Sequence, residues 1–476
     1  MRWIIRAAVA AVIALQGGVS AAAPSGTEAV AIIGADILPM AGPERLRNQT
    51  VIVRGDRIVD IGPRSRVRVP AGARRIDASG MTLMPGLVDL HVHLAPAPGE
   101  KGDAAARSLA VMLGYGTTTA RSLAGAPIHP EVRAKLEKGE LPGPRIYIGT
   151  AAMHGQNTPD EAAARKKVAE AKAQGFDLVK SHHLEKIEVW QALQDEAAKQ
   201  KLPTAGHVTN QVGIGRAMQA RQQIEHLDGM LVELLPKDSP ARAIPFGQLP
   251  PPPVIQALSN VTDADFRRLA QQVKAAGSYQ VPTMALFERV FDLATPTERF
   301  AAEPAMRFIP KETLQQWAKQ REGLSKMGLT PEVAARLLDI RRRLFRAFYE
   351  AGVPMMPGSD TPQGYHVWGE GLIKEIESFV AAGMKPIDAL RSATVVPRNY
   401  FRSLPNGGST LGWKADFGTV EKGGRADLIL LAGDPTKRIA ELRNLKGVMA
   451  AGVWRDRAAL DSLHDEAAAA ANPPGK

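Results

Sequence analysis

Apolar, β-branched runs alternate with amphipathic, alanine-rich stretches through the middle of the chain, roughly between residues 84 and 412. A first run at 81–90 is followed by runs at 116–123, 145–154, 177–181, 203–208, 223–227, 279–286 and 353–360. Patterns with a helical period lie between them, for example at 160–174 and 189–201. Strands that alternate with helices predict parallel βαβ units. Eight such units predict an α/β fold in which 84–412 forms a (β/α)8 TIM barrel.

The two ends of the chain have a different pattern, with short strands and tight turns. The segment 24–83 includes a hairpin pattern around Gly55 and Asp56, and 413–460 is strand-rich as well. We expect both ends to combine into one small β-sandwich, with 461–476 as a tail.

Two segments of the middle region, 229–262 and 287–330, exceed the usual length of a loop. They can be lids or substrate walls over the mouth of the barrel. Surface decoration or a contact in a homo-oligomer explains them equally well.

Residues 1–23 have the pattern of an export signal. Arg2 and Arg6 flank an apolar segment at 4–15, and small residues at 20–23 offer a cleavage site. The apolar segment is short for a membrane span, and no later stretch is long and apolar enough for one. We therefore expect a secreted or periplasmic protein without a membrane anchor.

Composition restricts the chemistry further. The 476 residues include no cysteine, which excludes disulfides and thiolate metal ligands. The net charge of +11 is scattered, and no basic run is interleaved with aromatic residues, so we expect no nucleic-acid partner.

The first apolar run of the middle region ends in His91 and His93. Side chains at positions i and i+2 of a strand point to the same side, so both imidazoles share one face at the carboxyl end of this strand. Two imidazoles on one face provide half of a metal site, whereas the alternative is a pair of polar residues with unrelated partners.

Polar residues also occur at the carboxyl ends of four later strands. In a closed parallel barrel these ends meet at one rim, so we expect the side chains to converge there. They are Lys180, His207, His226 and Asp360.

This pattern resembles the amidohydrolase superfamily. The resemblance rests on the HxH pair, the lysine, the two further histidines and the aspartate at these strand ends, and on the segments 389–394 and 418–428. Within the superfamily the chain looks most like the imidazolonepropionase-related branch, which includes Xaa-Pro dipeptidase-like enzymes, Xaa-Arg/Lys carboxypeptidases and ochratoxin-hydrolysing amidases. Several of those peptidases have a second histidine where this chain has Thr209, so their substrate specificity does not transfer directly.

The resemblance implies two divalent metal ions, for which imidazole and carboxylate ligands suit Zn²⁺. His91, His93 and Asp360 would hold one ion, and His207 and His226 the other. A protonated lysine is disfavoured beside two cations, and the resemblance implies that Lys180 is carboxylated by CO₂ and bridges them. The alternative is a core lysine, which would need an anionic partner.

The implied activity is hydrolysis of a C–N bond in a small amide, such as a dipeptide or an N-acyl amino acid, by a metal-bridging hydroxide. Asp360 would act as general base and then as general acid. His154, at the end of the third strand, could polarise the substrate carbonyl, or it could be a loop histidine bonded to the backbone. Three alternatives remain: a cyclic-amide hydrolase like imidazolonepropionase, a lactonase or esterase, and a non-catalytic scaffold.

Several other polar residues have weaker functional interpretations. We expect Thr209 and Ser359 to orient ligands through their hydroxyls. Arg121 could bind a substrate carboxylate or form a structural ion pair, and Glu225 should point away from His226. The remaining histidines are expected either near the site, as His182, His183 and His366, or at the surface, as His129 and His464.

Overall fold

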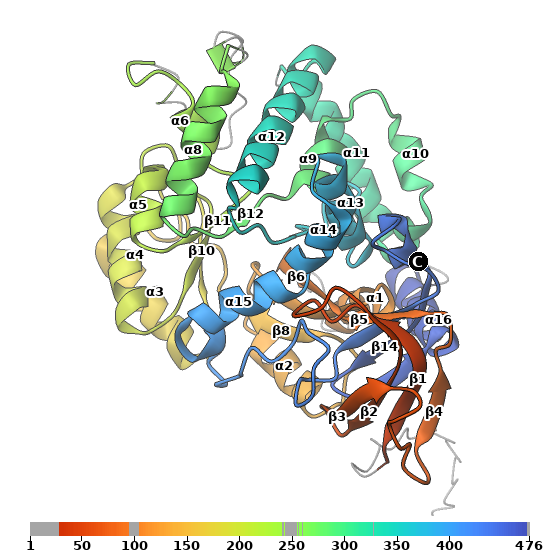
Figure 1. The fold of residues 1–476 in the computed structure, drawn as a ribbon. Coiled ribbons are helices and arrows are strands. Elements are labelled where there is room, and N and C mark those ends of the chain that lie inside the picture. Colours follow the sequence, from red (N-terminus) through yellow and green to blue (C-terminus); the bar gives the residue numbers. More distant parts are fainter. Residues whose placement is uncertain are drawn as a thin grey trace, which may run out of the picture.

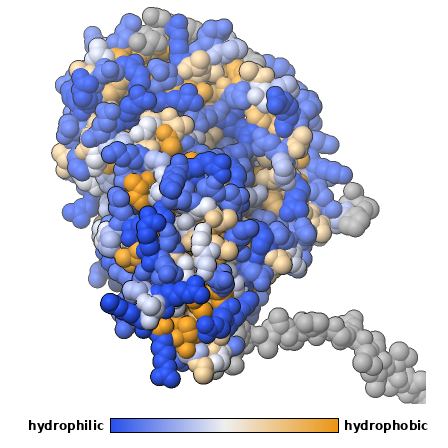
Figure 2. Space-filling model, turned by 45° about the vertical axis from the view of Figure 1, so that its right-hand side comes forward, coloured by the Kyte–Doolittle hydropathy of each residue, from blue (hydrophilic) through white to orange (hydrophobic). Residues whose placement is uncertain are grey.

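The computed structural model describes residues 28–94, 104–239, 242, 255, 257–258, 260–326 and 328–473. The expected export signal at 1–23 and part of the 229–262 segment lie outside these ranges. Within them, no helix combines the length and apolar character that crossing a bilayer requires. The face shown in Figure 2 is mostly hydrophilic, with small scattered apolar patches.

Strands from both ends of the chain form one eight-stranded sheet, in which the red and dark blue segments of Figure 1 lie side by side. Its path is β15-β14-β13-β5-β1-β2-β3, and β4 pairs with β1. Ile429 of β13 pairs with Met84 of β5, which joins the two ends, and the hairpin expected at Gly55 and Asp56 links β2 to β3. The strands are β1 (Val30–Ile37), β2 (Leu46–Arg54), β3 (Arg57–Pro63), β4 (Arg74–Asp77), β5 (Thr82–Pro85), β13 (Leu428–Leu431), β14 (Leu445–Ala450) and β15 (Val453–Asp456).

The expected single strand at 81–90 is in fact two strands that belong to different sheets. β5 belongs to the sheet of the termini, whereas β6 (Leu87–Val92) begins the parallel strands. Gly86 lies between them, and a Cβ atom there would be 2.1 Å from Oγ1 of Thr118. The chain therefore passes between the two sheets at a point where only glycine fits.

The parallel strands follow one another in sequence order. One sheet contains β6, β7 (Thr117–Ser122) and β8 (Arg145–Ile148), and the other contains β9 (Val179–Ser181), β10 (Thr204–Gly206), β11 (Gln223–Glu225) and β12 (Gln280–Val281). Isolated parallel bridges add further pairings, and they are Gly149 with Leu178, Gln280 with Met355, and Val92 with Thr361. The last two bridges connect the extended segment after residue 353 to β12 on one side and to β6 on the other.

Helices separate these strands, as the alternating pattern predicts. The expected helices at 160–174 and 189–201 are α3 (Glu161–Ala173), whose N-terminus is capped by the Asp160 carboxylate, and α4 (Ile187–Lys199). The others include α1 (Ala104–Gly114), α2 (His129–Glu137), α5 (Gly213–Gln219), α6 (Met230–Glu233), α8 (Asp263–Ala275), α12 (Pro331–Ala351), α13 (Glu370–Ala381), α14 (Pro386–Ser392) and α15 (Val395–Ser403).

The expected strand at 279–286 is wrong in its second half. The strand β12 ends at Val281, and α9 (Met284–Phe291) begins three residues later. Thr283 has a φ of 47°, which ends the extended backbone, and the Glu375 carboxylate accepts hydrogen bonds from the backbone N–H groups of Met284 and Ala285. A carboxylate at a helix N-terminus stabilises the helix there.

The 287–330 segment contains α10 (Thr297–Ala301), the 3₁₀ helix η2 (Pro304–Phe308) and α11 (Lys311–Lys326). Phe291, Leu293 and Leu324 pack against the buried residues Leu329 and Leu337, so this segment shares a small apolar core with the start of α12.

The expected tail contains most of helix α16 (Arg457–Ala471), which packs against α1. His464 of this helix is buried, and its Nε2 donates a hydrogen bond to the Val111 carbonyl. His129 is also fully buried, at the start of α2. The prediction of surface positions for these two histidines is therefore wrong, because each lies where a helix packs on its neighbours.

Candidate active site

His91, His93 and Asp360 meet beyond the carboxyl end of β6. Asp360 Oδ1 lies 3.3 Å from His91 Nε2 and 3.1 Å from His93 Nε2. His91 is fully buried, whereas the His93 side chain is 38% exposed. The Asp360 backbone N–H donates to the His91 carbonyl at 2.7 Å, so pairing between adjacent chain segments holds the carboxylate beside the imidazoles.

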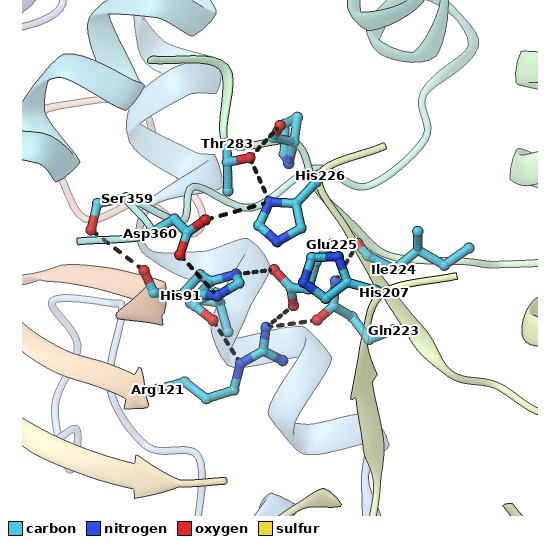
Figure 3. Close-up of polar contacts among 12 residues, drawn as sticks. His91, Arg121, His207, Gln223, Ile224, Glu225, His226, Thr283, Ser359 and Asp360 are labelled. Atoms are coloured by element: carbon cyan, nitrogen blue, oxygen red, sulfur yellow. Dashed lines mark hydrogen bonds and ion pairs between the residues drawn. The ribbon is translucent and has the colours of Figure 1, made fainter. Parts of the chain in front are cut away.

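The histidines after β10 and β11 continue this group. The His226 ring centroid lies 4.8 Å from that of His91 and 4.6 Å from that of His207. Figure 3 shows the His226 ring above His91, with the Asp360 carboxylate between them and the His207 ring alongside. Among the described residues, one group has ligand atoms that all lie within 4.8 Å of one another, and it consists of His91, His226 and Asp360.

Hydrogen bonds to Nδ1 orient the rings of His91, His207 and His226. His91 Nδ1 lies 2.8 Å from Glu225 Oε2, and His207 Nδ1 lies 2.7 Å from Asp228 Oδ2. An ionised carboxylate only accepts, so beside it the proton is on Nδ1 of each ring and the lone pair is on Nε2. Thr283 donates its hydroxyl proton to the Pro282 carbonyl, so its oxygen accepts from His226 Nδ1 at 2.8 Å.

The His91 lone pair faces another acceptor. Burial lowers the pKa of His91 well below its usual value, so Nε2 carries no proton there. Burial opposes ionisation of Asp360, whereas His93, whose Nε2 lies 3.1 Å from Oδ1, lowers the pKa of this carboxyl. Two acceptors 3.3 Å apart repel each other unless a cation lies between them, so the arrangement fits a bound metal ion.

Lys180 has the burial expected of a core residue but not the partner. Its side chain is 2% exposed, and Nζ has no hydrogen-bond partner among the residues that the structure describes. Burial lowers its pKa, which favours the neutral amine. An unpartnered buried amine is costly, and a carboxylated lysine would remove that cost by exchanging the amine for an anion beside the metal ligands.

A model of the amidohydrolase family matches residues 82–455. The chain belongs to the amidohydrolase family. An imidazolonepropionase from Symbiobacterium thermophilum is 26% identical over 450 residues, which cover 90% of this chain and 97% of that protein.

Solved structures show the same fold at lower identity. A Xaa-Pro dipeptidase with bound methionine has a TM-score of 0.64 and 20% identity, and the match covers 90% of this chain and all of that one. An ochratoxinase from A. niger has a TM-score of 0.60 and 18% identity, with 90% and 96% covered. The fold is thus of the TIM-barrel type, and this amidohydrolase is a hydrolase that acts on carbon–nitrogen bonds.

His154, the expected catalytic residue, bonds to its own loop. β8 ends at Ile148, so His154 is in the following loop, where its Nε2 is 3.0 Å from Asn157 Nδ2. None of its polar contacts with described residues reaches a proposed ligand. The regular strand is therefore shorter than the expected 145–154, although Met153 still forms a parallel bridge with Ser181 next to Lys180.

Arg121 and Glu225 of the amidohydrolase form a buried ion pair at 2.5 Å, so the structural interpretation of both residues holds. Strand alternation predicts that Glu225 points away from His226, but its other carboxylate oxygen binds His91, so Glu225 also supports the ligand group. β11 ends at Glu225, and His226 has a φ of 60°. The alternation of side chains along a strand no longer applies after such a turn, and both residues face the ligand group.

The other candidates occupy different surroundings. The Ser359 hydroxyl contacts the His91 carbonyl at 3.4 Å, whereas the Thr209 hydroxyl donates to the Leu184 carbonyl. The His182 ring packs 4.3 Å from that of His207 and 4.1 Å from that of His183. His366 is buried, and burial lowers its pKa to about 3.

Three residues that sequence reasoning missed hold the ligands in place. They are Asp228 beside His207, Thr283 beside His226, and Asp89, whose Oδ1 accepts from the backbone N–H groups of His91 and Ser359. Burial raises the pKa of Asp89 to about 7. Asp228 follows His226 by two residues, and this spacing is the feature of the sequence that could have indicated its place near the ligands.

Proposed function

We propose that this amidohydrolase is a binuclear metal-dependent enzyme that hydrolyses the amide bond of a small substrate, such as a dipeptide or an N-acyl amino acid. The observation that carries the proposal is the approach of His91 Nε2 to Asp360 Oδ1 at 3.3 Å, although both atoms are buried and neither has a hydrogen-bond partner among the described residues. A site built to hold cations accounts for this contact, whereas a scaffold that binds none does not.

His91, His93 and Asp360 would hold one divalent ion, and His207 and His226 the second, with Zn²⁺ suited to this donor set. The neutral Lys180 amine would add to CO₂ and release a proton, and the resulting carbamate would bridge the two ions. The unpartnered, buried Nζ supports this assignment.

When bound, such a pair of ions supplies Lewis acidity and an activated water at neutral pH. The residues of the chain do the rest. Asp360 accepts the proton of the attacking water and returns it to the leaving amine. His154 would contact the substrate carbonyl after a rearrangement of its loop, since its present partner is Asn157.

A cyclic-amide hydrolase is the second candidate, favoured by the 26% identity to an imidazolonepropionase over 90% of the chain. Enzymes of that type work with one metal ion and lack a lysine at the position of Lys180.

We also propose that the parallel strands close into a complete (β/α)8 barrel, that the sheet of the termini forms a small sandwich, and that 1–23 directs export.

The deciding experiment measures metal content and turnover together. Protein beginning at residue 24 is loaded with Zn²⁺, its zinc is counted by elemental analysis, and it is assayed against a library of dipeptides, N-acyl amino acids, cyclic amides and lactones. About two zinc ions per chain with amide turnover supports the proposal. One ion with cyclic-amide turnover supports the second candidate, lactone turnover alone indicates an esterase, and absence of bound zinc and turnover indicates a scaffold.

A further inference from the structure

The turns after β11 and β12 carry unusual backbone conformations beside the ligand group. His226, Leu227 and Thr283 have φ values of 60°, 59° and 47°. Residues other than glycine adopt this left-handed region at a cost, and they remain there only when the surroundings hold them. Both turns are therefore positions where the structure must supply additional support.

Arg341 of α12 supplies that support, although it lies 115 residues beyond His226 and 59 beyond Pro282 in the sequence. Its Nη1 donates to the His226 carbonyl at 3.0 Å, and its Nη2 donates to the Pro282 carbonyl at 2.7 Å. The guanidinium carbon lies 3.7 Å from the centre of the Phe287 ring, so the planar group also stacks on α9. One side chain thus joins the ends of two neighbouring strands to the helix that follows them.

The same guanidinium reaches the His226 ring by a second route. The Pro282 carbonyl that accepts from Arg341 also accepts from the Thr283 hydroxyl, at 2.8 Å. The oxygen of this hydroxyl in turn accepts from His226 Nδ1. Arg341 therefore contacts the backbone of His226 directly and orients its ring through Pro282 and Thr283.

Burial of Arg341 is unfavourable in free energy for a residue that would serve only a structural hydrogen bond. Its side chain is 6% exposed, and no carboxylate among the described residues lies within salt-bridge distance of it. Burial of a charged guanidinium without a direct counter-ion is unfavourable, and two backbone carbonyls compensate only part of it. Burial lowers the pKa of Arg341 to about 10, and the acidic groups that oppose this most are Asp228, which binds His207, and Glu375, which holds the start of α9.

We propose that Arg341 is a positioning residue of the metal centre, which fixes the direction of the His226 Nε2 lone pair by holding the turns after β11 and β12 together. This inference rests on the proposed function, since it assumes that His226 binds a metal ion. Arginine suits the task because its rigid fork reaches two carbonyls at once, which the single ammonium group of lysine cannot do.

The test uses Co²⁺, whose visible spectrum reports coordination. Metal-free wild type, Arg341→Met, Arg341→Lys and the control Arg342→Met are titrated with Co²⁺, and the binding of each ion and its absorption are recorded. Arg342 is the next residue of the same helix and pairs with Glu288 away from the site. We expect Arg341→Met to lower the affinity for one of the two Co²⁺ ions by about 10–100-fold and to change the absorption spectrum of that ion. Arg341→Lys should lose less affinity.

Each outcome is decisive. Wild-type affinity and spectrum in Arg341→Met overturn the inference, while binding of fewer than two ions by the wild type overturns the proposed function instead. If the circular dichroism spectrum shows that Arg341→Met does not fold like the wild type, the variants Thr283→Val and Thr283→Ser provide the test instead. If Thr283→Val loses the affected Co²⁺ ion and Thr283→Ser keeps it, the path through the hydroxyl is supported. If both variants bind Co²⁺ like the wild type, that path is overturned.

Discussion

Glu225 accepts a hydrogen bond from His91 Nδ1 at 2.8 Å, and its other oxygen lies 2.5 Å from Arg121 Nη2 (Figure 3). All three side chains are buried. The carboxyl group therefore uses both oxygens, one to orient a proposed metal ligand and one to pair with Arg121, whose charge opposes the rise that burial causes in the pKa of Glu225. A chain of this kind extends the metal centre beyond the residues that would touch the ions.

Replacement of Glu225 by glutamine tests this chain. The amide has one oxygen, so it cannot accept from His91 and Arg121 together, and its NH₂ group faces a donor. We expect metal affinity to fall about 10–100-fold, measured by competition with a chelating dye. Glu377→Gln, which affects an ion pair with Arg443 far from the site, should bind metal like the wild type. Equal affinities in both variants would contradict the proposed role.

Replacement of Asp360 by asparagine separates catalysis from metal binding. The amide oxygen can remain near the ions but cannot carry the proton from the attacking water to the leaving amine. We expect the bound metal to remain largely in place and kcat to fall by about 10²–10⁴-fold or more. The measurement is kcat per metal-loaded chain. A loss of only a few-fold would mean that another group moves the proton.

The positions of His91, His93, His226 and Asp360 at one rim could be predicted because they depend on regular features. Parallel strands place their carboxyl ends together, and hydrophobic runs locate those ends in the sequence.

The strand pattern does not predict the roles of Glu225 and Thr283. Both lie at turns where the backbone enters a left-handed conformation, at His226 and at Thr283 itself, and alternation along a strand gives no direction after such a turn. The burial of His464 depends on α16 packing against α1, about 350 residues earlier in the chain, and no local pattern reports that contact.

Lys180→Ala tests the proposed carbamate. Removal of the amine should reduce metal content to about one ion per chain or less, because the bridging anion is lost. Short carboxylic acids such as acetate or propionate should restore part of the metal content and turnover, since they supply a carboxylate in the vacated space. Lys199→Ala, on the exposed side of α4, is the control. Full metal content without added acid would show that Lys180 does not bridge the ions.

The buried His464 should make stability fall in mild acid. Burial lowers its pKa to about 4, below the usual 6.5, so the folded chain disfavours the charged ring while the unfolded chain accepts the proton. Its contribution to the free energy of unfolding is complete above pH 6.5 and is lost as the pH falls toward 4. By linkage the loss should reach about 2 kcal/mol by pH 5. Urea unfolding of metal-free wild type and His464→Gln at pH 7.5 and 5 measures it. The stability difference between the two proteins should change by that amount, and a difference that stays constant with pH would show that the ring does not titrate in this range.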